Sequence, residues 1–377
     1  MQLHVPESML RDLRQRLEMA RWPAEELVDD WSQGAPLWRV KHLVEYWKRH
    51  YDWRRVESLL NSFGQYRTVI DGVSIHLLHA RSPHAEAMPI MLTHGWPGSV
   101  LEFRNVIRRL THPTEFGGSQ RDAFHVVVPS LPGFGFSDQP DDLGWGRVRT
   151  AKAWAEIMPR LGYDHYLSQG GDWGAAVNAQ LGVLRPKGLL GIHLNFPQIV
   201  PPDLDLDHLT PEEQAAMDQL NRQQQNEIGY QLEMMTRPQT VSYSLADSPV
   251  GQAAWIYEKF GVWSDSNKNP ESIWTLDEAG RRRHCASLPP HERVRCTVPL
   301  RAATQARRCP RLARRRRDRN ALAGPGDCRR VPASTADRLS AFNGAQQSMH
   351  DTRRDAASAV LGHPPRTPGG VHQLSPG

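Results

Sequence analysis

The chain has 377 residues, contains 12 Trp, and carries a formal net charge of +5. This length accommodates one large α/β domain with insertions or two domains, and it is sufficient to bury a sizeable core. The N-terminus is polar and no apolar run reaches about 18 residues, so the sequence predicts neither a leader nor a membrane span. We therefore expect a cytoplasmic protein.

Charge and aromatic residues are distributed unevenly along the chain. Residues 1–280 hold 26 basic and 35 acidic side chains, whereas residues 281–377 hold 20 Arg, no Lys and six acidic side chains. All 12 Trp and all eight Tyr precede residue 281, and all four Cys follow it. The Cys spacings match no zinc motif. The sequence thus predicts no metal and no cofactor.

Residues 1–65 are typical of an N-terminal arm. Apolar residues recur at nearly helical spacing over residues 7–22, between Pro6 and Pro23, and again over residues 37–51. Four Trp punctuate the region, which indicates packing against a large partner. We expect this arm to lie over a catalytic domain rather than to act as a targeting segment.

Residues 66–196 carry the pattern of an α/β core. Alternating runs at 66–70 and 73–79, joined by Asp71-Gly72, predict a β-hairpin. Apolar strands at 89–92, 125–128 and 188–195, with a helical run at 150–161, predict a mostly parallel sheet covered by helices on both faces. Residues 197–278 are polar and helical, and we expect them to form a cap over the carboxyl ends of the strands.

The core is organised around the segment Gly170-Gly171-Asp172-Trp173-Gly174, which lies between a strand-like run and a helix-like run. Small residues flank Asp172 on both sides, as in the strand-to-helix turn called a nucleophile elbow. A carboxylate is ionised at neutral pH and attacks carbon without a base, although only an electrophilic carbon is a suitable target. Taken alone, the same five residues also fit a loop with an Asx-turn.

Further motifs follow one another along residues 5–278, about three quarters of the chain. Together they resemble one known family specifically. This part of the sequence resembles an epoxide hydrolase of the α/β-hydrolase superfamily, of the microsomal and juvenile-hormone type with an N-terminal arm. The matching segments are Arg21-Trp22-Pro23, Glu45-Tyr46-Trp47, Tyr51-Asp52-Trp53, His94-Gly95-Trp96-Pro97-Gly98-Ser99, Pro129-Ser130-Leu131-Pro132-Gly133, Gln169 to Gly174, Gly229-Tyr230, Thr236-Arg237-Pro238, Asp247 to Gly251, and Glu258-Lys259-Phe260.

The resemblance implies a role for each matching residue. Asp172 would attack an epoxide carbon to form an ester, and Tyr230 of the cap would protonate the epoxide oxygen. The backbone N–H groups of Trp96 and Trp173 would form the oxyanion hole used when the ester is hydrolysed. Pro97 and Trp173 would line the substrate pocket. His94 ends a strand and is expected to be structural, because the base of the family comes much later in the chain.

Residues 279–377 depart from the family pattern. We recognise neither the expected second cap tyrosine, nor the late acidic residue, nor the base His of a Gly-Gly-His-Phe-like loop. The segment Gly369-Gly370-Val371-His372 resembles that loop only weakly, and we treat the similarity as coincidence. The Arg-rich composition resembles translation in a shifted reading frame. We expect this tail to be disordered, the last strands of the sheet to be missing, and the ester to accumulate because no His activates water.

Three alternatives remain at this point. A haloalkane dehalogenase also uses an aspartate followed by a tryptophan, although the arm and Tyr230 favour an epoxide hydrolase. The basic tail could bind nucleic acid through phosphate contacts, but it lacks any recognisable motif. A catalytically inactive remnant is the third reading. The expected partners are an epoxide and water, with no membrane and no specific nucleic acid; a homodimer is left open.

Overall fold

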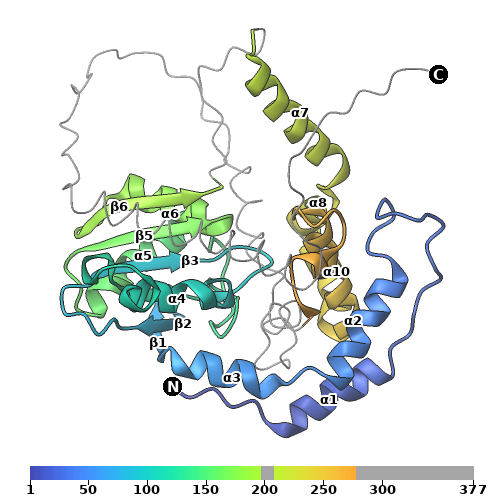
Figure 1. Ribbon diagram of the computed structural model, residues 1–377, viewed down its shortest axis with the longest axis horizontal. Coiled ribbons are helices and arrows are strands. Elements are labelled where there is room, and N and C mark those ends of the chain that lie inside the picture. Colours follow the sequence, from blue (N-terminus) through green and yellow to red (C-terminus); the bar gives the residue numbers. More distant parts are fainter. Residues whose placement is uncertain (197–207, 277–377) are drawn as a thin grey trace, which may run out of the picture.

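The computed structural model describes residues 1–196 and 208–276 (Figure 1). Its centre is a six-stranded sheet in the order β1-β2-β4-β3-β5-β6. The β1/β2 and β2/β4 pairs are antiparallel, and the other three pairs are parallel. The strands are β1 Gln65–Ile70, β2 Val73–Ala80, β3 Met88–Thr93, β4 Phe124–Pro129, β5 Tyr166–Gly171 and β6 Leu189–Asn195.

The predicted hairpin is present. Ile70 pairs with Val73, and the two turn residues Asp71 and Gly72 both have positive φ, at 49° and 80°. Two successive positive φ angles define a type I′ turn, whose twist matches that of the flanking strands. The Asp-Gly pair is therefore the local cause of the β1–β2 connection.

Helices cover both faces of the sheet, as the alternation of strand residues requires. Ile90 of β3 and Val126 of β4 pack with α4 (Arg104–Thr111) in one core cluster. Their neighbours Met91 and Val127 pack on the opposite face, in a second cluster with α5 (Arg147–Arg160) and α6 (Trp173–Leu184). Successive side chains of a strand point to opposite faces, so each apolar strand needs two covering layers.

The arm contains three helices, α1 (Glu7–Glu18), α2 (Leu37–Arg49) and α3 (Trp53–Ser62). Helix α1 ends four residues before the predicted boundary at Trp22. The residue before a proline avoids the helical region, so Pro23 already excludes Trp22 from the helix. Helix α3 was not predicted; its N-cap is Asp52, whose side chain accepts a hydrogen bond from the Arg54 N–H.

The described residues of the segment that we expected to form a cap are mainly helical. They form α7 (Pro211–Asn226), α8 (Gly229–Thr236), α9 (Pro238–Asp247) and α10 (Pro249–Val262). Three of these helices begin with proline, which suits the first helical position because its missing N–H would have no helical partner there. Figure 1 shows α10 beside the arm, and the two pack through a shared apolar cluster of Leu17, Val40, Val44, Trp47, Val250 and Ala253.

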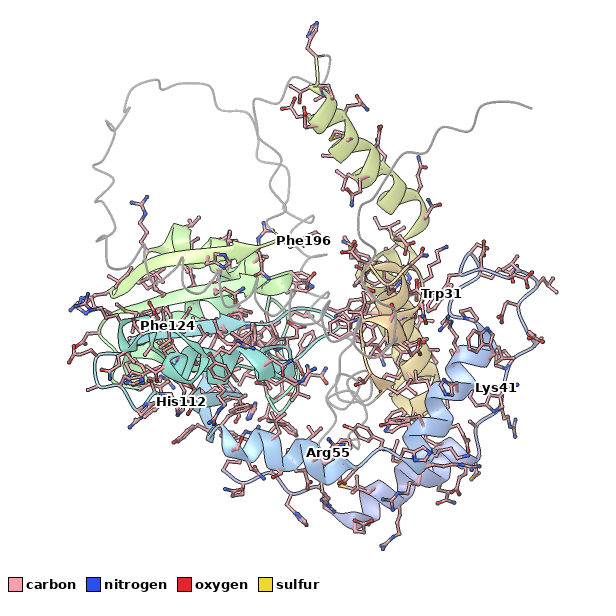
Figure 2. The ribbon with its side chains drawn as sticks, in the orientation of Figure 1. Trp31, Lys41, Arg55, His112, Phe124 and Phe196 are labelled. Atoms are coloured by element: carbon pink, nitrogen blue, oxygen red, sulfur yellow. The ribbon has the colours of Figure 1, made fainter. Side chains whose placement is uncertain are left out.

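The arm therefore contacts the cap as well as the core. Trp31 of the arm is buried and its ring lies 5.8 Å from that of Tyr257 in α10 (Figure 2). A Cβ on Gly261 of α10 would lie 2.4 Å from the Trp31 ring, so the glycine permits this close approach. These contacts fix α10 relative to the arm, and α10 carries side chains that reach the site described below. The expected tail and the expected loss of the last strands concern residues 277–377, which lie outside the described residues.

Candidate active site

Asp172 stands at the turn between β5 and α6. Its backbone has φ 52° and ψ −122°, a conformation that a non-glycine residue adopts only when the surrounding structure enforces it. The close packing of the turn explains the neighbouring glycines. A Cβ on Gly174 would lie 2.0 Å from the backbone oxygen of Thr93 at the end of β3. The geometry is that of the predicted elbow.

The turn after β3 brings two hydrogen-bond donors to the Asp172 carboxylate. The Trp96 backbone N–H donates to Oδ1 over 2.8 Å, and the Trp173 backbone N–H also donates to the carboxylate. Gly95 makes room for this contact, because a Cβ there would lie 2.4 Å from Oδ1. The two N–H groups expected to form an oxyanion hole thus converge on one carboxylate. The Trp96 N–H is held by Oδ1, so this donor leaves the Oδ2 atom unengaged.

Burial sets the protonation behaviour of Asp172. The side chain keeps surface exposed to solvent, yet protein surrounds it closely enough that desolvation raises its pKa. The hydrogen bonds from Trp96 and Trp173 act in the opposite direction and lower the pKa, but desolvation is the larger effect. A carboxylate with a raised pKa is more basic than an ordinary one, and hence a better nucleophile once it is ionised.

His94 is fully buried beside this turn. Its Nε2 accepts a hydrogen bond from the Leu131 backbone N–H over 3.1 Å, and its Nδ1 lies 3.1 Å from the Gly95 carbonyl oxygen. Both ring nitrogens are therefore engaged with backbone, which fits a neutral ring whose Nδ1 carries the proton. Burial lowers the pKa of His94 to about 4. This arrangement supports the expected structural role and leaves no nitrogen to activate water.

Tyr230 of α8 lies over the turn that follows β3. Its ring stacks on that of Trp96, with centroids 4.7 Å apart and an interplanar angle of 12°. Trp263 meets both rings edge-on, at 5.2 Å from Tyr230 and 5.8 Å from Trp96. Burial, then the charges of Asp172 and Glu258, raise the pKa of Tyr230 to about 12. The phenol is therefore protonated at neutral pH and lies within electrostatic range of Asp172.

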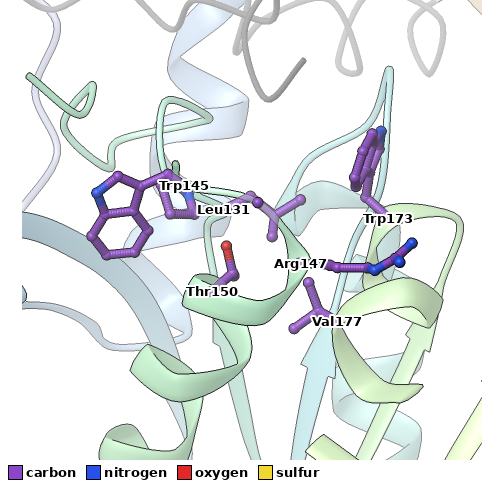
Figure 3. A pocket seen from close by; sticks show the side chains of 8 residues that line it. Leu131, Trp145, Arg147, Thr150, Trp173 and Val177 are labelled. Carbon is purple, nitrogen blue, oxygen red and sulfur yellow. The ribbon is translucent and has the colours of Figure 1, made fainter. Parts of the chain in front are cut away.

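A pocket opens beside the elbow (Figure 3). It is a hollow of about 290 Å³, part of it open to solvent, between the loop after β4 and the first turns of α5 and α6. The lining is mainly apolar, with Arg147 as its charged member: Leu131, Pro132, Trp145, Gly146, Arg147, Thr150, Trp173 and Val177. Trp173, predicted to line a substrate pocket, is one of these residues. Pro97, which follows Trp96, is not.

The other expected groups are not in the described part of the chain. The second cap tyrosine, the late acidic residue and the base His were all expected after residue 276. Two side chains that reach Tyr230 were given no role by sequence reasoning: Trp263 and Lys259, whose ammonium lies 4.5 Å from the Tyr230 ring centroid. The two residues are four positions apart at the end of α10, which places them on one helix face. Residues that only pack against a core have the same spacing, so the sequence alone does not single them out.

Residues 1–196 and 208–276 were searched for metal-binding clusters and for membrane-spanning helices. No group of three or more His, Cys, Asp or Glu side chains there is arranged to hold a metal ion. No helix in this part is both long enough and apolar enough to cross a bilayer.

The strand order, the elbow after β5 and the helices that follow β6 are those of an α/β-hydrolase. Two family models match the chain: epoxide hydrolase N terminus over residues 1–103, and alpha/beta hydrolase fold over residues 88–239. The chain belongs to the epoxide hydrolase family, in the microsomal and juvenile-hormone type that carries this N-terminal segment.

Individual relatives agree with this assignment. A candidate epoxide hydrolase of Stigmatella aurantiaca is 58% identical over 274 residues, which cover 73% of this chain and 62% of the relative. The crystal structure of juvenile hormone epoxide hydrolase from the silkworm Bombyx mori aligns with a TM-score of 0.72 at 27% identity, covering 81% of this chain and 76% of the other.

An enantioselective mutant of the Aspergillus niger epoxide hydrolase aligns with a TM-score of 0.68 at 31% identity, covering 81% of this chain and 78% of the other. The chain spans about three fifths of the length of the curated relatives that it matches, at 62% of the S. aurantiaca protein.

Proposed function

We propose that this protein opens epoxides by covalent catalysis. Asp172 attacks an epoxide carbon through the carboxylate oxygen that is not held by Trp96, the C–O bond of the ring breaks, and Tyr230 gives its proton to the released oxygen. The products of this step are a hydroxyalkyl ester on Asp172 and a phenolate on Tyr230. The observation that carries the proposal is that Trp96 meets both residues: its N–H donates to Oδ1 of Asp172 and its ring stacks on that of Tyr230.

The same turn prepares the second half of the reaction. When water adds to the ester carbonyl, negative charge develops on the oxygen that the Trp96 N–H already holds, and the Trp173 N–H also donates to this carboxylate. Donors placed in advance at such an oxygen are worth about 10²- to 10³-fold in rate each. The product of hydrolysis would be a vicinal diol, with the acid group regenerated on Asp172.

We further propose that hydrolysis is the impaired half. The sequence after residue 278 has no recognisable Gly-Gly-His-Phe-like loop to supply a base, and His94 has both ring nitrogens engaged with backbone. Without a base, water attacks the ester slowly and the covalent intermediate persists. The proposed domains are an arm at residues 1–65, a core at 66–196 that carries Asp172, and a cap at 197–278 that carries Tyr230.

Time courses of the full chain with styrene oxide test both halves. Intact-mass analysis reports the ester and chromatography reports the diol. We expect one equivalent of ester per chain, with diol formation slower than ester formation. Sustained diol release without a trapped adduct would contradict the impaired second half. The absence of both ester and diol would contradict the proposed activity itself. Chloride release from a short haloalkane would instead identify the dehalogenase alternative.

A further inference from the structure

A buried cation lies against the proposed acid. Lys259 of α10 is only 5% exposed, whereas lysine side chains are almost never buried without a specific partner. Its ammonium lies 4.5 Å from the ring centroid of Tyr230 and 5.5 Å from that of Trp263. The cation therefore lies at the edge of the aromatic cluster formed by Trp96, Tyr230 and Trp263.

Pairing with an acid explains only part of this arrangement. Lys259 forms an ion pair with Glu258, the preceding residue in α10, whose side chain is 22% exposed. Removing an ammonium from water is costly, so an ion pair at this depth is weak evidence for a purely stabilising role. An apolar side chain would fill the same space beside the rings at lower cost. The charge, rather than the volume, distinguishes Lys259 from such a replacement.

The charges around Tyr230 make a cation useful there. Asp172 faces it from the elbow and Glu258 from α10, and both carboxylates disfavour a phenolate. Glu227, just before α8, lies in the field of both Glu258 and Lys259, and Lys268 contributes a further positive charge to it. Among the described groups, Lys259 is the cation in direct contact with the ring. It opposes the two carboxylates at the moment the phenol loses its proton.

We propose that Lys259 is a positioning residue for Tyr230, holding the ring against Trp96 and stabilising the negative charge that the ring gains during epoxide opening. This inference rests on the proposed function. In the step concerned, an Asp172 oxygen bonds to the epoxide carbon, the ring C–O electron pair moves to oxygen, and that oxygen takes the Tyr230 proton. The resulting phenolate lies beside the Lys259 ammonium, and solvent returns the proton afterwards.

A double-mutant cycle separates this role from a packing role. The full chain is mixed with styrene oxide at a series of concentrations up to saturation, and the rate of ester formation on Asp172 is followed by quenched intact-mass analysis. Lys259→Met, which keeps the length and removes the charge, is expected to slow ester formation about tenfold, with the half-saturating epoxide concentration unchanged. Lys259→Arg is expected to retain most of the rate. In a Tyr230→Phe background, Lys259→Met is expected to have no further effect.

Two controls complete the design. Lys41→Met removes another cation that lies over an indole, 5.7 Å from the Trp22 ring in the arm, and should leave the rate unchanged. Lys259→Gln is measured beside Lys259→Met, so that a folding failure of one variant leaves the comparison intact. Wild-type ester formation with an unchanged rate in Lys259→Met and Lys259→Gln would overturn this inference alone, as would equal losses in both Tyr230 backgrounds. No wild-type ester would overturn the proposed function together with it.

Discussion

The Tyr230 ring lies flat on the Trp96 ring, with centroids 4.7 Å apart, while the Trp96 backbone N–H holds the Asp172 carboxylate. One residue therefore links the proposed acid to the proposed nucleophile. Because the side chain and the backbone of Trp96 serve different groups, the position of the cap and the position of the nucleophile are coupled through a single turn after β3.

The hydroxyl of Tyr230 is predicted to act in ester formation. Tyr230→Phe keeps the stacked ring and removes the proton donor, so ester formation on Asp172 should slow by about 10²-fold or more. Rapid-quench intact-mass analysis with styrene oxide gives the rate. Tyr243→Phe, at a tyrosine that is 72% exposed, is the matched control and should react at the wild-type rate. Equal rates in Tyr230→Phe and the wild type would remove Tyr230 from the mechanism.

The pH dependence of ester formation follows from two pKa shifts. Desolvation raises the pKa of Asp172, and only the ionised carboxylate attacks, so the rate should rise with pH through a midpoint above the ordinary value of 3.8. The raised pKa of Tyr230, about 12, keeps the phenol protonated, so the rate should hold its plateau through mildly alkaline pH. A rate that already falls near neutral pH would show that a different acid supplies the proton.

The same shift in Asp172 has a consequence for stability. A carboxyl group whose pKa is raised on folding favours the folded state below its unfolded pKa, and this contribution is lost as pH rises through the folded pKa. Asp172→Asn should therefore raise the midpoint of thermal unfolding at pH 7, and the gain should shrink as the pH approaches the ordinary aspartate range. Asp141→Asn, at an exposed position, is the control and should show no such trend.

The elbow is predicted to tolerate no side chain at Gly174. Gly174→Ala would place a Cβ 2.0 Å from the Thr93 backbone oxygen, which cannot move without displacing β3. Denaturant titration should show a loss of about 3 kcal/mol or more in the free energy of unfolding, at the upper end for overpacked sites. Gly229→Ala has open space around the new Cβ, and its free energy of unfolding should remain near that of the wild type.

Much of the fold could be predicted because local signals agree with the global arrangement. The Asp71-Gly72 turn depends on residues close in sequence, and the apolar strands and the glycines around Asp172 form recognisable local patterns, so their positions could be predicted from residue order alone. Helix α3 escaped prediction because its register depends on packing against the core through Trp53, Val56 and Leu60. Such burial is decided by distant residues.

The site also has one part that the sequence could predict and another that it could not. The approach of Trp96 to Asp172 follows from motif spacing, since both lie at the ends of adjacent parallel strands. The stack of Tyr230 on Trp96 and the position of Lys259 depend on how α8 and α10 sit over the sheet. That placement is fixed by long-range packing of α10 on the arm, through contacts such as those of Val250 with α1 and α2. No spacing rule within the cap sequence specifies it.

Peptide mapping after incubation of the full chain with styrene oxide tests the central claim most directly. The peptide containing Asp172 should gain the mass of one styrene oxide, and fragmentation should place the addition on the Asp172 carboxylate. In Asp172→Asn the addition should disappear, while thermal unfolding shows that the variant is folded. An unmodified Asp172 peptide after prolonged incubation, or an adduct of equal yield in Asp172→Asn, would contradict the role of this aspartate as the nucleophile.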